Sequence, residues 1–172
     1  AGLSYNTSML LNFILWSLLF AATLYWLFRE LRVSSWIAVF GTVAMYIHMY
    51  AHVWRPINLQ PVYPFYFLFN IALVRTIRES SRRNSIFLAS MTGIMFYLYS
   101  YLWQAFAITL GILFLYALWR KDQQLMKASL LSSVLGAIIG LPTLLYALWL
   151  SHTSPYFWES VSRLGLVNTH LP

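Results

Sequence analysis

The sequence predicts an all-α fold, a polytopic transmembrane helical bundle of about six spans, and three observations lead to this prediction. The chain of 172 residues is 60% hydrophobic and only 9% charged, whereas a soluble domain carries about 25% charged residues. Long apolar stretches alternate with short basic ones along the whole chain. The longest of these stretches, residues 86–119, contains no charged residue. Together these features exclude an ordinary soluble domain.

The uncharged stretch 86–119 decides how the chain is organised. As one straight helix it would be about 51 Å long, against a hydrocarbon core of about 30 Å. We therefore expect it to reverse near Ser100, in the tyrosine- and tryptophan-rich segment 97–103, because these residues favour the membrane–water boundary. The result is a short hairpin with spans at 86–100 and 102–119. The first span is short, so it must thin the bilayer, pack against other helices, or begin within 82–85.

The residues before the hairpin supply three further spans. Residues 9–28 are mostly apolar and long enough to cross once, and 36–54 forms the second span. The connection 55–64 holds three prolines, so we expect an extended, ordered lid rather than a regular helix. The third span covers 61–77.

The last span, 128–150, closes a transmembrane region that covers residues 1–150. Gly136 and Gly140 have the small-xxx-small spacing that permits close helix approach. Pro142 should kink this helix. Residues 151–172 are only moderately apolar, and we expect an outer-face interfacial segment with a short helix in 155–167.

The basic residues allow the topology to be tested. With six spans, nine of the 11 basic residues share one side, and only Arg55 and Arg163 lie opposite. A single span across 86–119 would reduce this to seven against four. The positive-inside rule therefore favours the hairpin and assigns the basic side to the cytoplasm of a multi-pass protein, which we place in a prokaryotic plasma membrane. The net charge of +7 reflects topology, and no nucleic-acid partner is expected.

The two minority arginines are the best candidates for an outer binding site. Arg55, beside the proline-rich connection, and Arg163 together could hold a phosphate or pyrophosphate. Contact with lipid headgroups or a local salt bridge is the simpler interpretation. Glu159, the one outer carboxylate, is a candidate general base, and it could equally pair with Arg163 at i+4.

The histidines offer a second, weaker pattern. His48 and His52 are four apart and share one helix face, as a pair of metal ligands would. A divalent metal ion or haem there is one interpretation, and polar residues facing a watery cavity is the other. The acidic residue of the zinc-protease motif is missing between them. The chain has no cysteine, which excludes disulfides and thiolate ligands. No motif in the sequence identifies a cofactor.

The order of these features resembles the membrane core of GT-C glycosyltransferases. The likeness rests on the proline-containing outer loop 56–64, the basic cytoplasmic loop, the hairpin segment 93–103, and the Leu141-Pro142 helix leading into an outer segment. Such enzymes transfer sugars from polyprenyl-phosphate carriers on the outer face of the membrane. The resemblance implies that Arg55 or Arg163 touches the carrier's phosphate. It also implies a cleft lined by His52 and Glu159, with Tyr63 counted among the phosphate-binding candidates.

Three classes of function follow from the sequence. The family's catalytic acid normally lies in its first outer loop, and this chain has no outer Asp, so a transferase would carry that acid before Ala1. The ends at Ala1 and Pro172 lead us to expect a piece of a larger polypeptide. A non-catalytic scaffold or subunit that binds partner helices is the main alternative, and a transporter or flippase is the third. The expected partners are membrane lipid, a lipid-linked sugar, and either the rest of the polypeptide or partner helices.

Overall fold

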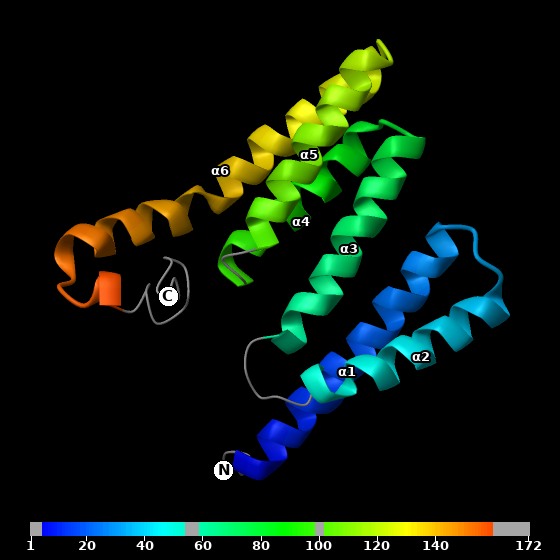
Figure 1. Ribbon diagram of the computed structural model, residues 1–172, viewed down its shortest axis with the longest axis vertical. Coiled ribbons are helices and arrows are strands. Elements are labelled where there is room, and N and C mark those ends of the chain that lie inside the picture. The colour runs from blue at the N-terminus through cyan, green and yellow to red at the C-terminus, as the bar shows by residue number, and fades with distance from the viewer. Residues whose placement is uncertain (1–4, 54–58, 99–101, 160–172) are drawn as a thin grey trace, which may run out of the picture.

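Six helices account for most of the structure, a computed structural model that describes residues 5–53, 59–98 and 102–159 (Figure 1). They are α1 (Tyr5–Glu30), α2 (Ser35–Val53), α3 (Leu59–Arg78), α4 (Arg82–Leu98), α5 (Leu102–Trp119) and α6 (Gln123–Thr153). Within the described ranges no residue belongs to a strand. The prediction of an all-α fold is confirmed.

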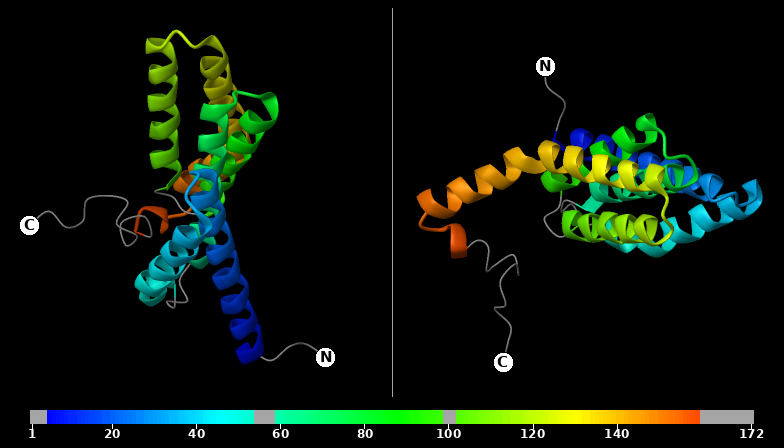
Figure 2. Two further views of the ribbon diagram at one scale, coloured as in Figure 1. Left: turned by 90° about the vertical axis from the view of Figure 1, so that its right-hand side faces the viewer. Right: turned by 90° about the horizontal axis from the view of Figure 1, so that it is seen from above.

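Successive helices run in opposite directions along the molecule (Figure 1, Figure 2). The connections after α1, α3 and α5 therefore lie at one end, and these connections and the helix ends beside them carry the nine basic residues that the sequence groups together. α4 and α5 form the predicted hairpin on either side of residues 99–101. α5 has the predicted bounds, whereas α4 begins at Arg82, and an earlier start was one of the three alternatives given for the short span.

The proline-rich connection is shorter than predicted. An extended lid over 55–64 is wrong for residues 59–64, because α3 already begins at Leu59. Pro61 lies in the first turn, where backbone N–H groups have no helical partner, so it costs no hydrogen bond. Pro64 does remove one bond, but Val62 and Phe67 are buried to 2% and 6% exposure, and their packing stabilises this start of the helix.

Three of the six helices are long and apolar enough to cross a membrane. They are Asn6–Glu30 within α1, then α5, and then α6. The apolar part of α2, Ser35–His48, is shorter, and α4 has only 17 residues. The structure therefore supports three candidate spans where the sequence predicted about six.

The exterior of the bundle is far more apolar than that of a water-soluble bundle. Three large apolar residues of α5, Ile108, Ile112 and Leu115, are more than 60% exposed. The interior holds a hydrophobic core, and small polar residues are buried beside it, among them Ser85, Thr92, Ser129 and Ser132. Their hydroxyls donate to backbone carbonyls, as Thr92 does to the Leu88 oxygen at 2.8 Å. An extensive apolar exterior over such an interior is typical of helices that face lipid, so the fold is that of a membrane protein.

The α4–α6 pair is packed most closely, through glycines on both helices. A Cβ atom on Gly93 would lie 2.5 Å from Cβ and Cγ2 of Ile139, and one on Gly140 would lie 2.4 Å from the Phe96 ring. A Cβ on Gly136 would lie 3.0 Å from Thr92. The close approach predicted from the Gly136 and Gly140 spacing is confirmed, and its partner helix is α4.

The direction of α6 changes past its midpoint, near Pro142 (Figure 1). Proline has no N–H, so the carbonyl four residues earlier loses its helical hydrogen bond. The next carbonyl, that of Ile139, accepts a hydrogen bond from the Tyr97 hydroxyl at 2.7 Å. Beyond this point α6 extends away from the other helices (Figure 2). Tyr146 and Trp149 on this arm are 59% and 58% exposed.

Replacing Gly93 by alanine should lower the free energy of unfolding by about 1–3 kcal/mol, because the new methyl group meets the β-branched Ile139 and neither backbone can easily move. The measurement is the apparent melting temperature of the purified protein in detergent micelles, followed by circular dichroism.

Gly111→Ala is the matched control. A Cβ at this exposed position on α5 meets no atom within 4 Å, so stability should stay the same or rise by at most about 1 kcal/mol, since alanine favours helix over glycine. Equal melting temperatures for the two variants would contradict the close contact between α4 and α6.

Candidate functional site

The predicted outer site lies only partly within the described residues. Arg55 and Arg163 fall outside the described ranges, and α2 includes His52 without its side chain being described. The two-arginine phosphate clamp therefore stays a prediction. His48 and Glu159 are described, and both side chains are exposed.

Tyr63 has a packing contact in the structure. Its ring meets the buried ring of Phe20 edge to face, with centroids 5.7 Å apart, and so ties α3 to α1. Phe67, one turn further along α3, meets the same ring of Phe20 at 5.2 Å. This aromatic cluster positions the first half of α3. A phosphate-binding role for the Tyr63 hydroxyl stays a prediction.

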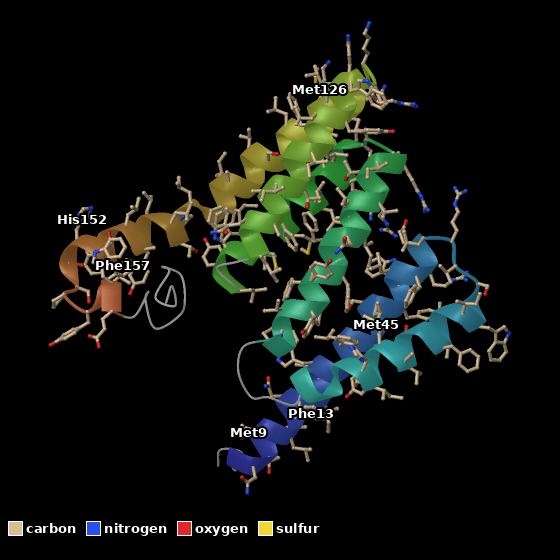
Figure 3. The ribbon with its side chains drawn as sticks, in the orientation of Figure 1. Met9, Phe13, Met45, Met126, His152 and Phe157 are labelled. Carbon is tan, nitrogen blue, oxygen red and sulfur yellow. The ribbon has the colours of Figure 1, made fainter. Side chains whose placement is uncertain are left out.

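The described parts of the chain that carry His48 and Glu159 lie on opposite sides of the molecule (Figure 3). His152 and Phe157 lie on the arm of α6 and just after it, on the opposite side of the molecule from Met45 of α2 (Figure 3). His48 is one turn further along α2 from Met45. In the part of the chain that the structure describes, no group of three histidine or carboxylate side chains gathers as a metal ion would require. A metal site at His48 and His52 stays a prediction.

The structure does gather charged side chains at the opposite, basic end. Glu30, at the end of α1, accepts two hydrogen bonds at Oε2 from Arg75 of α3, from Nε at 3.0 Å and from Nη2 at 2.8 Å. Oε1 of Glu30 lies 3.8 Å from Nη1 of Arg78. The Arg75 guanidinium also lies over the Trp26 ring, 5.0 Å from its centroid. The Glu30 side chain is only 16% exposed and that of Arg75 is 37% exposed, so this ion pair is partly shielded from solvent, and it joins α1 to α3.

A pocket of about 360 Å³ opens beside this ion pair. Its lining comes from the ends of α1 and α3 and the start of α4: Glu30, Arg75, Arg78, Glu79, Ser81, Arg83 and Asn84. The Asn84 amide donates to the Glu79 carbonyl at 2.9 Å and to the Arg75 carbonyl at 3.4 Å, which fixes the short turn between α3 and α4. Three arginines and two glutamates line the pocket, so it carries one net positive charge. Such a pocket can hold an anion.

Sequence reasoning missed this pocket because it attributed every basic residue on this side to membrane topology. Two signals were present. Arg75 and Arg78 are three apart, which places them on one face of a helix. Glu30 is an acidic residue within an otherwise basic helix end, and only the fold shows that it pairs with Arg75.

Comparisons of the chain with protein-family models, with curated proteins and with solved structures found no match in any of the three. The class of the protein therefore follows from its own structure. It is an all-α membrane protein with three candidate spans and a charged pocket at its basic end.

Replacing Glu30 by glutamine should lower the free energy of unfolding by about 1–2 kcal/mol, because a neutral amide cannot pair with the charge of Arg75 between α1 and α3. Thermal unfolding in detergent measures this effect. Glu79→Gln is the control, because Glu79 is exposed and its carboxylate pairs with no described residue. Its effect should stay within about 0.5 kcal/mol. Equal losses in both variants would show that the Glu30–Arg75 pair contributes nothing specific.

Proposed function

We propose that this chain is part of an integral membrane glycosyltransferase of the GT-C type, which uses a lipid-phosphate-linked sugar on the outer face of the membrane. The proposal includes six membrane crossings. The observation that carries it is the alternating direction of the six helices (Figure 1). Because of this alternation, the last residues of α2 and α6 lie opposite the end that carries the nine basic residues (Figure 1).

The shorter helices are compatible with six crossings. α4, with 17 residues, is about 26 Å long, slightly less than the hydrocarbon core of about 30 Å. It contacts α3, α5 and α6, so protein rather than lipid surrounds much of its length. α3 ends with Arg75 and Arg78 in its last turn, and arginine side chains at a helix end can reach the polar boundary.

The proposed chemistry assigns the arginines to the leaving group. As the bond between the sugar and the carrier phosphate breaks, negative charge develops on the phosphate oxygen. Arg55 and Arg163 would stabilise that charge through bidentate hydrogen bonds. A base activates the acceptor hydroxyl, which forms the new glycosidic bond and gives up its proton. Glu159 is the weak candidate within this chain, and the catalytic acid known from the family has no counterpart here.

A non-catalytic subunit that binds partner helices is the second candidate. It is favoured by the arm of α6 beyond Pro142, where no helix of the described residues covers several large apolar side chains: Leu145, Tyr146, Leu148 and Trp149. A partner helix or lipid would cover this surface equally well. The activity measurement below separates the two candidates.

The six-span topology predicts where single cysteines can be labelled. These 172 residues contain no cysteine, so this part of the protein contributes no background labelling. An impermeant thiol reagent applied to intact cells should label Trp158→Cys and should label Lys121→Cys only after the membrane is opened. Ile108→Cys, on the lipid-facing side of α5, should resist the reagent in both conditions. Labelling of positions 121 and 158 from the same side would exclude six spans.

Removal of either outer arginine should abolish most activity. In membranes containing the whole protein, Arg55→Ala and Arg163→Ala should each reduce turnover of a polyprenyl-phosphate sugar by about 10- to 1000-fold, because the leaving phosphate loses a charged donor. Arg120→Ala, which removes the same charge at the basic end, should have no effect. Wild-type turnover in both outer variants, at equal protein level, would remove the phosphate role.

A further inference from the structure

The pocket beside the Glu30–Arg75 ion pair is lined by three arginines, and these differ in how many of their N–H groups already donate a hydrogen bond. Arg75 directs Nε and Nη2 at Glu30. Arg78 approaches Glu30 only at 3.8 Å, too far for a hydrogen bond. Arg83 makes no hydrogen bond or ion pair with any residue of the described ranges through its side chain. Each guanidinium group carries five N–H donors, so Arg78 and Arg83 present unused donors beside the pocket.

The start of α4, which contributes Ser81, Arg83 and Asn84 to the pocket lining, also has backbone donors without a partner in the described ranges. Ser81 caps this helix, because its hydroxyl accepts from the Asn84 N–H at 3.3 Å and its carbonyl accepts from the Ser85 N–H at 3.0 Å. The preceding N–H groups, those of Arg82 and Arg83, have no partner among the described residues. Free N–H groups and the dipole at a helix start favour an anion. The side chains and the backbone therefore select the same sign of charge.

The surroundings of the pocket are both positive and apolar. Beside the nine basic residues, only three carboxylates lie at this end of the molecule, those of Glu30, Glu79 and Asp122. Large apolar side chains flank the pocket residues along the chain, with Trp26 39% exposed, Leu31 49% and Ile77 47%. A small soluble anion would use only the charged part. An amphiphile would use both parts, with its head in the pocket and its chains along α1 and α3.

We propose that the pocket at the junction of α1, α3 and α4 binds the phosphate group of an anionic phospholipid from the leaflet that the basic end faces. Arg78, Arg83 and the first N–H groups of α4 hold the phosphate oxygens. Arg75 compensates the charge of Glu30, and Arg78 and Arg83 together outweigh the charge of Glu79, the other carboxylate that lines the pocket. The bound lipid would join α1, α3 and α4 at their ends. This role is independent of the proposed transferase activity, which belongs to the opposite end.

Native mass spectrometry of the purified protein, mixed in detergent with phosphatidylglycerol or phosphatidylcholine, tests this proposal. The wild-type protein should retain phosphatidylglycerol about tenfold better than phosphatidylcholine, and the double variant Arg78→Ala/Arg83→Ala should lose this preference. Absence of any preference in the wild-type protein would overturn the proposal. The melting temperature without lipid shows whether the double variant folds. If it does not fold, Arg78→Lys/Arg83→Lys replaces it and should weaken the preference, because lysine cannot bind phosphate bidentately.

Two further measurements separate the pocket from general attraction. Arg120→Ala/Lys127→Ala removes the same charge at the same end, from exposed positions outside the pocket, and should keep the preference for phosphatidylglycerol. An equal loss in this control would overturn the proposal in favour of a diffuse electrostatic effect. Glycerol phosphate, which has the head but no acyl chains, should compete poorly. Competition as strong as that of the intact lipid would overturn the assignment to a lipid and point to a soluble phosphate.

Discussion

The close approach of α4 and α6 is the constraint on which the rest of this structure depends. Within hydrocarbon no hydrophobic force draws helices together, so packing contacts and a few hydrogen bonds must do so. Gly93, Gly136 and Gly140 remove the side chains that would keep the two backbones apart. The Ser132 hydroxyl, 3.0 Å from the Ser85 carbonyl, adds a polar contact between the same helices. α3 and α5 pack against this pair, and α3 in turn contacts α1 and α2.

The bend of α6 determines what the opposite end of the molecule can form. Pro142 interrupts the hydrogen bonds of α6, and Tyr97 of α4 stabilises the interruption by donating to the Ile139 carbonyl. The arm that follows leaves the bundle and extends away from α2 (Figure 1).

The basic end shows how residues that set topology also acquire a specific structure. The positive-inside rule concerns how many basic residues lie on one side of the membrane, and it does not specify how they are arranged relative to one another. In the fold, Arg75 is fixed between Glu30 and the Trp26 ring, which joins α1 to α3 and leaves Arg78 and Arg83 beside an open pocket. Glu30 therefore gives Arg75 a structural role, while Arg78 and Arg83 keep free hydrogen-bond donors. Charge counting along the sequence cannot make this distinction.

The sequence by itself determined the features that depend on neighbouring residues. These are the helical class, the reversal between α4 and α5, the bounds of α5, the close approach at Gly136 and Gly140 and the bend near Pro142. The start of α3 at Leu59 was not among them, because the packing of Val62 and Phe67 outweighs the bond lost at Pro64. Only the tertiary structure decided that Ile139 and Phe96 fill the space beside the glycines, and that Glu30 meets Arg75. Such contacts join segments far apart in the chain, and helix lengths and periodicities do not specify which faces meet.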